Sequence, residues 1–125
     1  MKYAVWVLQI LLALSFGAAG ATKLLLPRTQ LIEDGQTWAA DFTDTQVKLI
    51  GAGEAADAIG LIVPAATGIA PMLTPAAGVG LALVMGGAAA THVRRGEAPV
   101  AIPALVLGLL ALLTAYLTYR RYSRR

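Results

Sequence analysis

Two carboxylates stand inside an otherwise apolar stretch of helical length, residues 46–64. Glu54 and Asp57 are three residues apart, so an α-helix places them on one face, about one turn from each other. That face is polar and small, whereas the opposite face is apolar. If the stretch lies in a bilayer, each ionised acid costs on the order of 2.5–3.5 kcal/mol there. Acids in such a place must face protein or water and find partners.

Two basic side chains are the candidate partners. Lys23 ends the first apolar stretch of the chain, and His92 follows the third. Successive spans run in opposite directions, so the end of the first, the start of the second and the end of the third lie on one side. A lysine near the membrane boundary can extend toward Glu54. We therefore expect Lys23, Glu54 and His92 to converge near the outer face, with Asp57 one turn deeper, as a cluster that holds a polar headgroup or relays protons.

A purely structural explanation of the same residues stays open. Polar side chains in membrane spans often form interhelical hydrogen bonds worth under about 2 kcal/mol, and a Lys23–Glu54 pair can simply fix the register of two helices. His92 stands beside two arginines and can equally be a solvated turn residue. We interpret Lys48, near the start of its helix, as a lysine that extends to the membrane surface. A chain with one histidine and no cysteine is not expected to bind a metal.

The composition is that of an integral membrane protein. Of the 125 residues, 58% are hydrophobic and 14% are charged, whereas roughly a quarter of residues are charged in soluble domains. The absence of cysteine excludes disulfides, thiolate metal sites and thiol redox chemistry within the chain. A net charge of +3 does not indicate a nucleic-acid partner, because the basic residues lie at the ends of the apolar stretches, where they orient a membrane protein.

Four apolar stretches predict an all-α fold, an integral membrane four-helix bundle that forms a single domain over residues 1–125. We expect the spans at about residues 3–26, 46–64, 72–91 and 99–119, each long enough to cross a hydrocarbon core of about 30 Å. The second helix is expected to end at Pro64. The start of the chain also has features of a signal peptide, but its apolar run continues past the small-residue patch, which favours an uncleaved helix.

One face of the first span combines polar, aromatic and small side chains at helical spacing, and we expect it to be buried. Its members are Gln9, Ala13, Phe16, Gly20 and Lys23.

Residues 27–45 form the only substantial polar segment. They carry several acids together with Trp38 and Phe42, aromatic side chains that favour headgroup depth. We expect a loop lying along the membrane surface between the first two helices, with a short helical turn near residues 38–42. A lid over the mouth of the bundle is the alternative interpretation.

The distribution of basic residues predicts orientation. With four spans both termini lie on one side, where Lys2 and the C-terminal arginines give five basic residues. The opposite side has Arg28, Arg94 and Arg95, with two lysines near helix ends. The positive-inside rule then favours both termini in the cytoplasm, in the inner (plasma) membrane of the cell.

Three short motifs resemble those of the DoxX-like family of small four-helix membrane proteins: Gly20-Ala-Thr-Lys23, Leu49-Ile-Gly-Ala-Gly-Glu54 and Thr91-His-Val-Arg-Arg-Gly-Glu97. In that family a G-x-x-K ends the first helix, a glutamate comes early in the second and an H-x-R-x-G-E-like turn follows the third, which maps onto Lys23, Glu54 and His92. Asp57 and Trp38 match no family pattern. The resemblance implies a four-helix bundle. Members are associated with quinone-linked thiosulfate oxidation and membrane oxidoreductase complexes, and distant relatives resemble assembly factors.

The leading hypothesis is an accessory membrane protein that is not an enzyme on its own. Its cluster of Lys23, Glu54, Asp57 and His92 would hold a small amphiphile such as a quinone, or stabilise another membrane protein. The first alternative is a subunit of a quinone-linked membrane oxidoreductase, although the lack of cysteine argues against a thiol-based role. A small transporter ranks lowest, because one bundle leaves little room for alternating access unless the chain forms a homo-oligomer. A pocket of about 300 Å³ or more beside Glu54 would favour ligand binding, and closed packing there would favour a scaffold.

Overall fold

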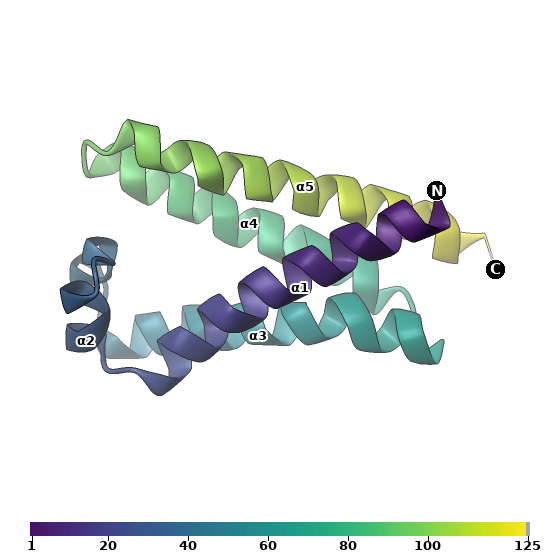
Figure 1. The fold of residues 1–125 in the computed structure, drawn as a ribbon, viewed down its shortest axis with the longest axis horizontal. Helices are drawn as coiled ribbons and strands as arrows, with labels where there is room; N and C mark the ends of the chain where they lie inside the picture. Colours follow the sequence, from purple (N-terminus) through teal and green to yellow (C-terminus); the bar gives the residue numbers. More distant parts are fainter. Residues whose placement is uncertain (125) are drawn as a thin grey trace.

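The computed structural model describes residues 1–124, and no strand occurs among them (Figure 1). Four long helices are present, α1 (Lys2–Leu25), α3 (Asp44–Thr67), α4 (Leu73–Arg94) and α5 (Ala98–Ser123), together with a short helix α2 (Arg28–Glu33) and a 3₁₀ helix η1 (Thr37–Asp41). The four long helices are long and apolar enough to cross a membrane. The predicted all-α membrane bundle is confirmed.

The long helices pack as two pairs. Helix α1 runs along α3, α4 runs along α5, and the two pairs meet mainly through α3 and α4. Both chain termini lie at one end of the bundle, and α2, η1 and the α4–α5 turn lie at the other (Figure 1). We call these the termini end and the cover end, and we call residues 28–42 the cover segment.

Glycines bring α1 and α3 into close contact. A Cβ atom on Gly20 would lie 2.7 Å from the carbonyl oxygen of Gly51, and one on Gly51 would lie 2.7 Å from the Cβ of Lys23. Backbones at this distance leave no room for larger side chains. The predicted inward face of α1 is confirmed, since its members Gln9, Phe16, Gly20 and Lys23 are buried.

Helix α3 does not end at Pro64, as the sequence suggested, but continues to Thr67. A proline inside a helix has no N–H for the carbonyl four residues earlier, which here belongs to Gly60. The Thr74 hydroxyl on α4 donates to that oxygen over 2.8 Å. The same contact is tight, because a Cβ on Gly60 would lie 2.9 Å from the Cβ of Ala77. The carbonyl released by the proline therefore ties α3 to α4.

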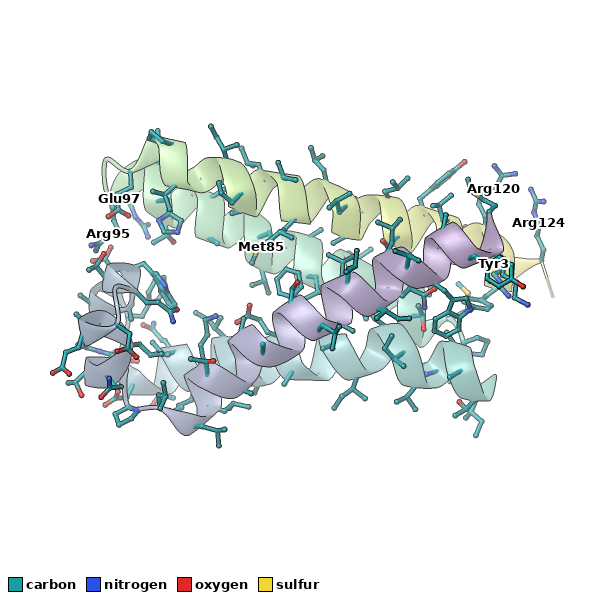
Figure 2. The ribbon with its side chains drawn as sticks, in the orientation of Figure 1. Tyr3, Met85, Arg95, Glu97, Arg120 and Arg124 are labelled. Atoms are coloured by element: carbon teal, nitrogen blue, oxygen red, sulfur yellow. The ribbon has the colours of Figure 1, made fainter. Side chains whose placement is uncertain are left out.

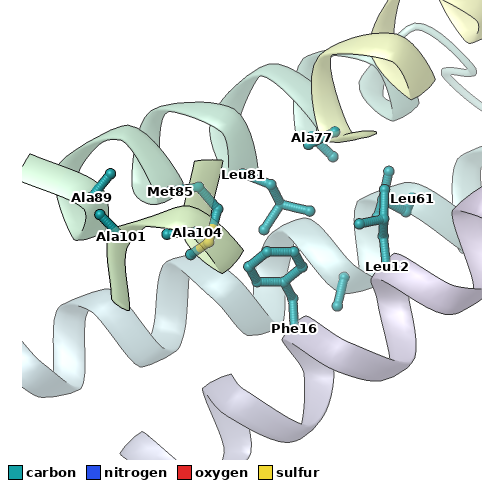
Figure 3. Packing of buried hydrophobic residues seen from close by; sticks show 11 residues of the cluster. Leu12, Phe16, Leu61, Ala77, Leu81, Met85, Ala89, Ala101 and Ala104 are labelled. Carbon is teal, nitrogen blue, oxygen red and sulfur yellow. The ribbon is translucent and has the colours of Figure 1, made fainter. Parts of the chain in front are cut away.

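A core of mixed large and small side chains fills the centre of the bundle. Phe16 and Leu12 of α1 meet Leu61 of α3 and Leu81 of α4, while alanines line the contact between α4 and α5 (Figure 3). Large apolar side chains also cover the outside, as Leu14, Leu83 and Leu109 are each about two-thirds exposed or more. Such a surface suits a bilayer, and the chain is a multi-pass membrane protein.

The cover segment is more ordered than the predicted surface loop. The expected helical turn is η1, but α2 precedes it, beginning directly after Pro27. Leu31 and Ala39 are fully buried and pack with Val47 of α3, flanked by Trp38 and Phe42. This second small core attaches the segment to the bundle.

Candidate functional site

The buried acid of α3 is paired with the lysine that ends α1. Lys23 Nζ lies 2.7 Å from Glu54 Oε1, and the two side chains are only 11% and 2% exposed. The glycine contact between α1 and α3 places the two residues at adjoining positions near the cover end. The ammonium also lies 5.5 Å from the ring centroid of Trp38, a cation–π contact from the cover segment. The expected meeting of Lys23 and Glu54 is present in the structure.

Lys48 has a role at the end of α1 that the sequence did not reveal. Its ammonium donates to three main-chain carbonyls at the end of α1, those of Lys23 (2.8 Å), Leu24 (3.1 Å) and Leu26 (2.6 Å). The last carbonyls of a helix have no partner within it and carry partial negative charge. Lys48 therefore caps α1 and fixes the turn that presents Lys23.

A cavity of about 500 Å³ lies beside the ion pair, between α3 and α4. Its walls come from α1, the cover segment, α3 and above all α4: Lys23, Trp38, Phe42, Ile50, Glu54, Val84, Met85, Gly87, Ala88, Ala90, Thr91, His92 and Arg94. Helices α3 and α4 touch near Gly60 and diverge toward the cover end (Figure 1). Since Gly87 and Ala90 line the cavity and are exposed, it reaches the side of the bundle that faces lipid.

His92 lines the cavity, but its hydrogen-bond partner is Glu97 and not the buried pair. Its Nδ1 lies 3.0 Å from Glu97 Oε1. Arg95 joins the same group, with Nε 3.4 Å from Glu97 Oε1 and Nη1 donating to Asp41 Oδ1 over 2.7 Å. Figure 2 shows Arg95 and Glu97 at the cover end. The Arg95–Asp41 contact, which the sequence did not reveal, fastens the cover segment to the α4–α5 turn.

This network shifts the pKa values of two of its members, Glu97 and Arg95. The hydrogen bond from His92, aided by the charge of Arg95, holds the pKa of Glu97 below its usual value. The hydrogen bond to Asp41 raises the pKa of Arg95 above its usual value. Glu97 and Arg95 are therefore both charged at neutral pH, and the link to the cover segment is ionic.

Asp57 lies one turn deeper than Glu54 but does not line the cavity. It is half-buried against α4, where a Cβ on Gly80 would lie 2.7 Å from its Oδ2 atom. Within the described part of the chain the carboxylate makes no hydrogen bond or ion pair. The predicted cluster is thus divided: Lys23, Glu54 and His92 share the cavity, and Asp57 lies below it between two helices.

The wall of the cavity is mostly apolar and has one polar side. Aromatic and aliphatic side chains form most of its wall, and Lys23, Glu54, His92 and Arg94 supply charge or hydrogen bonds. Over residues 1–124, no three histidine or acidic side chains gather closely enough to hold a metal ion. Such a lining suits a small molecule with an apolar body and a polar head.

Comparison with known proteins identifies the family. The sequence profile of the DoxX-like family matches residues 7–114, a range that contains every residue of the cavity wall. Neither a curated protein nor a solved structure matches the chain significantly. The match covers most of the chain and agrees with the four apolar helices, and the protein therefore belongs to the DoxX-like family.

Proposed function

We propose that this protein is an accessory membrane protein that binds a small amphiphile, such as a quinone, in the cavity beside Lys23 and Glu54. The observation that carries the proposal is a cavity of about 500 Å³ with a buried ion pair in its wall. Small-molecule sites commonly measure about 300–1,000 Å³ and are mostly apolar, with a few placed polar groups. If the Lys23–Glu54 pair only fixed the register of α1 and α3, we would expect other side chains to pack closely around it and to leave no cavity.

The lining suggests how such a ligand would lie. The rings of Trp38 and Phe42 form an edge-to-face pair with centroids 5.7 Å apart, and they offer an aromatic wall to a flat headgroup. Lys23 and His92 offer N–H donors to carbonyl oxygens of that headgroup. An apolar tail would leave past Gly87 and Ala90 into the lipid.

The polar groups of the wall favour binding over chemical conversion. Lys23 is paired with Glu54, and His92 contacts Glu97. The Thr91 hydroxyl donates to a main-chain carbonyl of its own helix over 2.9 Å. The Thr91 hydroxyl is therefore bonded to the main chain and not to a general base, which an activated hydroxyl nucleophile needs, and the paired Lys23 and His92 suit the orientation of a ligand. We therefore propose an accessory role rather than an enzyme that acts alone.

Two adjacent glycines of α4 provide the test. Gly86 and Gly87 are both exposed, and a Cβ on either would meet no atom within 4 Å, but only Gly87 lines the cavity. Gly87→Leu should fill part of the cavity without disturbing the bundle, and Gly86→Leu is the matched control. Wild type and both variants would be purified in mild detergent, and the small molecules extracted from each would be identified and quantified by mass spectrometry.

We expect wild type and Gly86→Leu to retain a discrete amphiphile at a constant ratio to protein. In Gly87→Leu the amount of this amphiphile per protein should be at least tenfold lower. Glu54→Gln should also lower retention, because it removes the charge that fixes Lys23. If wild type carries only bulk lipid, or if the two glycine variants retain the same molecule equally, the cavity is not a ligand site and the proposal fails.

A second candidate function, a subunit of a quinone-linked membrane oxidoreductase, is supported by Asp57. Its carboxylate lies within a span, one turn from Glu54, and makes no hydrogen bond or ion pair among the described residues. Such a group suits proton relay toward a ligand in the cavity.

Quinone reduction by the complex purified from native membranes would test this second function. Asp57→Asn should lower turnover and leave quinone retention unchanged, whereas the exposed Asp44→Asn should alter neither. Unchanged turnover in Asp57→Asn would contradict the relay.

A further inference from the structure

A second cavity, separate from the proposed amphiphile site, lies between α4 and α5 near the termini end. Its volume is about 420 Å³, and no charged side chain contributes to its lining. Its lining combines the small side chains of Ala76 and Ala115 with larger ones, which include Val79, Leu112, Tyr116 and Tyr119. Leu112 to Tyr119 spans roughly 10 Å along α5 at 1.5 Å per residue. The cavity is therefore an apolar groove that runs along the lipid-facing side of two helices.

A cation is held at the end of this groove. The guanidinium of Arg120 lies 5.8 Å from the ring centroid of Tyr116, and its Nη1 atom donates to the Tyr116 hydroxyl over 3.3 Å. Tyr116 itself lines the groove. Arg124 is the C-cap residue of α5, four positions after Arg120, and Figure 2 shows both arginines at this end of the helix. Because the tyrosine restrains its guanidinium, Arg120 presents charge beside the groove.

No acidic side chain stands near this charge in the part of the chain that the structure describes. All seven acidic residues of the chain lie at positions 33, 34, 41, 44, 54, 57 and 97, which are in the cover segment, the first half or so of α3 and the α4–α5 turn. The termini end carries Lys2, Arg120, Arg121 and Arg124, and the α3–α4 turn between Gly68 and Met72 is uncharged. Among residues 1–124 Arg120 has no ion-pair partner. Residues 1–124 therefore leave the guanidinium of Arg120 without a counter-ion.

We propose that the groove is a binding site for an anionic phospholipid. One acyl chain lies in the groove between α4 and α5, and the phosphate accepts hydrogen bonds from the guanidinium of Arg120, with Arg124 one turn farther out. Guanidinium and phosphate match in geometry and charge, and tyrosines favour the headgroup level where such a contact forms. A lipid of the surrounding leaflet fits better than a soluble partner, since the groove is on an apolar span.

Native mass spectrometry with defined lipids tests this proposal. The detergent-solubilised protein would be titrated with phosphatidylglycerol and with phosphatidylcholine that have the same acyl chains. Arg120→Gln removes the charge beside the groove, and Arg121→Gln is its matched control, because the Arg121 guanidinium lies over Tyr122 and not over a groove residue. Ala76→Leu fills the groove from an exposed position, and Ala66→Leu is a matched change on exposed α3 surface at the same end.

We expect wild type to retain phosphatidylglycerol at least tenfold better than phosphatidylcholine. Arg120→Gln should remove that preference, Arg121→Gln should keep it, and Ala76→Leu should weaken retention of both lipids while Ala66→Leu does not. Thermal unfolding of each variant would verify that the bundle is intact. Equal retention of the two lipids by wild type, equal losses in both arginine variants, or full retention by Ala76→Leu would each overturn the proposal.

Discussion

Lys23 and Glu54 are two charges withdrawn from water in a part of the chain where each alone would be costly. With 11% and 2% of their side chains exposed, both groups have lost most of their hydration and each depends on the other for its charge partner. Breaking one partner of a buried pair typically costs about 3–5 kcal/mol, whereas replacing both with neutral side chains costs far less. The pair is therefore a specific constraint on the α1–α3 contact, independent of the function proposed for the cavity beside it.

This asymmetry gives a prediction for single and double substitutions. Lys23→Met and Glu54→Gln should each lower the free energy of unfolding by ~3–5 kcal/mol. The first leaves the buried carboxylate of Glu54 unpaired, and the second leaves the buried ammonium of Lys23 without its charged partner. The double variant should lose clearly less than the sum of the two. Unfolding in mixed micelles with increasing denaturing detergent measures all three, with the exposed Lys2→Met as control. Additive losses would mean that the two groups do not interact.

Residues of the site differ in how well the sequence predicted them. Lys23 and Glu54 could be paired because each faces inward at the same end of neighbouring spans. The partners of Lys48 could not be foreseen, since they are main-chain carbonyls that become available only where α1 ends. Asp41 and Arg95 are 54 positions apart in polar segments without periodicity, and only the folded cover segment brings them together.

At the scale of helices, two glycines of α1 make a controlled comparison. A Cβ on Gly20 would lie 2.7 Å from a main-chain oxygen and 2.8 Å from a main-chain nitrogen of α3, whereas one on Gly17 would meet the Cβ of Ala58 at an ordinary 3.7 Å. Gly20→Ala should force the helices apart and cost about 1–3 kcal/mol. Gly17→Ala should be neutral or slightly stabilising. Equal stability of both variants in the same micelle assay would refute the close contact at Gly20.

The link between Pro64 and Thr74 predicts a coupling between α3 and α4. Thr74→Val removes the donor to the Gly60 carbonyl and should cost about 1–3 kcal/mol, because that partly buried oxygen is left unpaired. In a Pro64→Ala background the helix supplies its own N–H to the same oxygen, so Thr74→Val should cost less. Thr114→Val is the control, since that buried hydroxyl donates only within its own helix. A Thr74 effect that is unchanged by Pro64→Ala would contradict this explanation.

The sequence predicted the long helices better than the short ones. Each of the four spans has enough apolar residues to be recognised without any tertiary contact. Helix α2 has six residues and depends on the burial of Leu31 against α3, so no periodicity in its own sequence reveals it. The end of α3 was misplaced because Pro64 normally interrupts a helix, and the hydroxyl that compensates for it belongs to another helix. The cavity requires the divergence of α3 and α4, which is set by the small residues at their contact.

At the scale of the whole molecule, the attachment of the cover segment to the bundle should weaken at acidic pH. The pKa of Glu97 is lowered in the folded protein, so its stabilising contribution is present above the ordinary value of 4.5 and is lost as the pH falls below that toward the lowered pKa. Trp38 fluorescence in a Trp6→Phe background should therefore change as the pH falls below about 4.5. Glu97→Gln should show a smaller change over that range. An identical acid transition in Glu97→Gln would assign it to other carboxylates.

The separation of charge along the bundle predicts how it lies in the membrane. At the cover end Lys23 is buried against Glu54 and Lys48 binds the end of α1, which leaves Arg28, Arg94 and Arg95 as cations near that surface. The termini end has Lys2 and the C-terminal arginines and no acidic side chain. Basic residues near span ends are retained on the cytoplasmic side, where anionic lipids are also enriched.

Both termini should therefore be cytoplasmic, with the cover segment and the mouth of the cavity on the opposite side. A C-terminal fusion to a fluorescent protein that folds only in the cytoplasm should fluoresce, and a fusion to a phosphatase that is active only outside should be silent. Changing Arg120, Arg121 and Arg124 together to glutamine should produce a mixture of both orientations, because the remaining bias is small. A silent fluorescent fusion on the wild-type chain would reverse the assignment and would place the arginine-flanked groove in the outer leaflet.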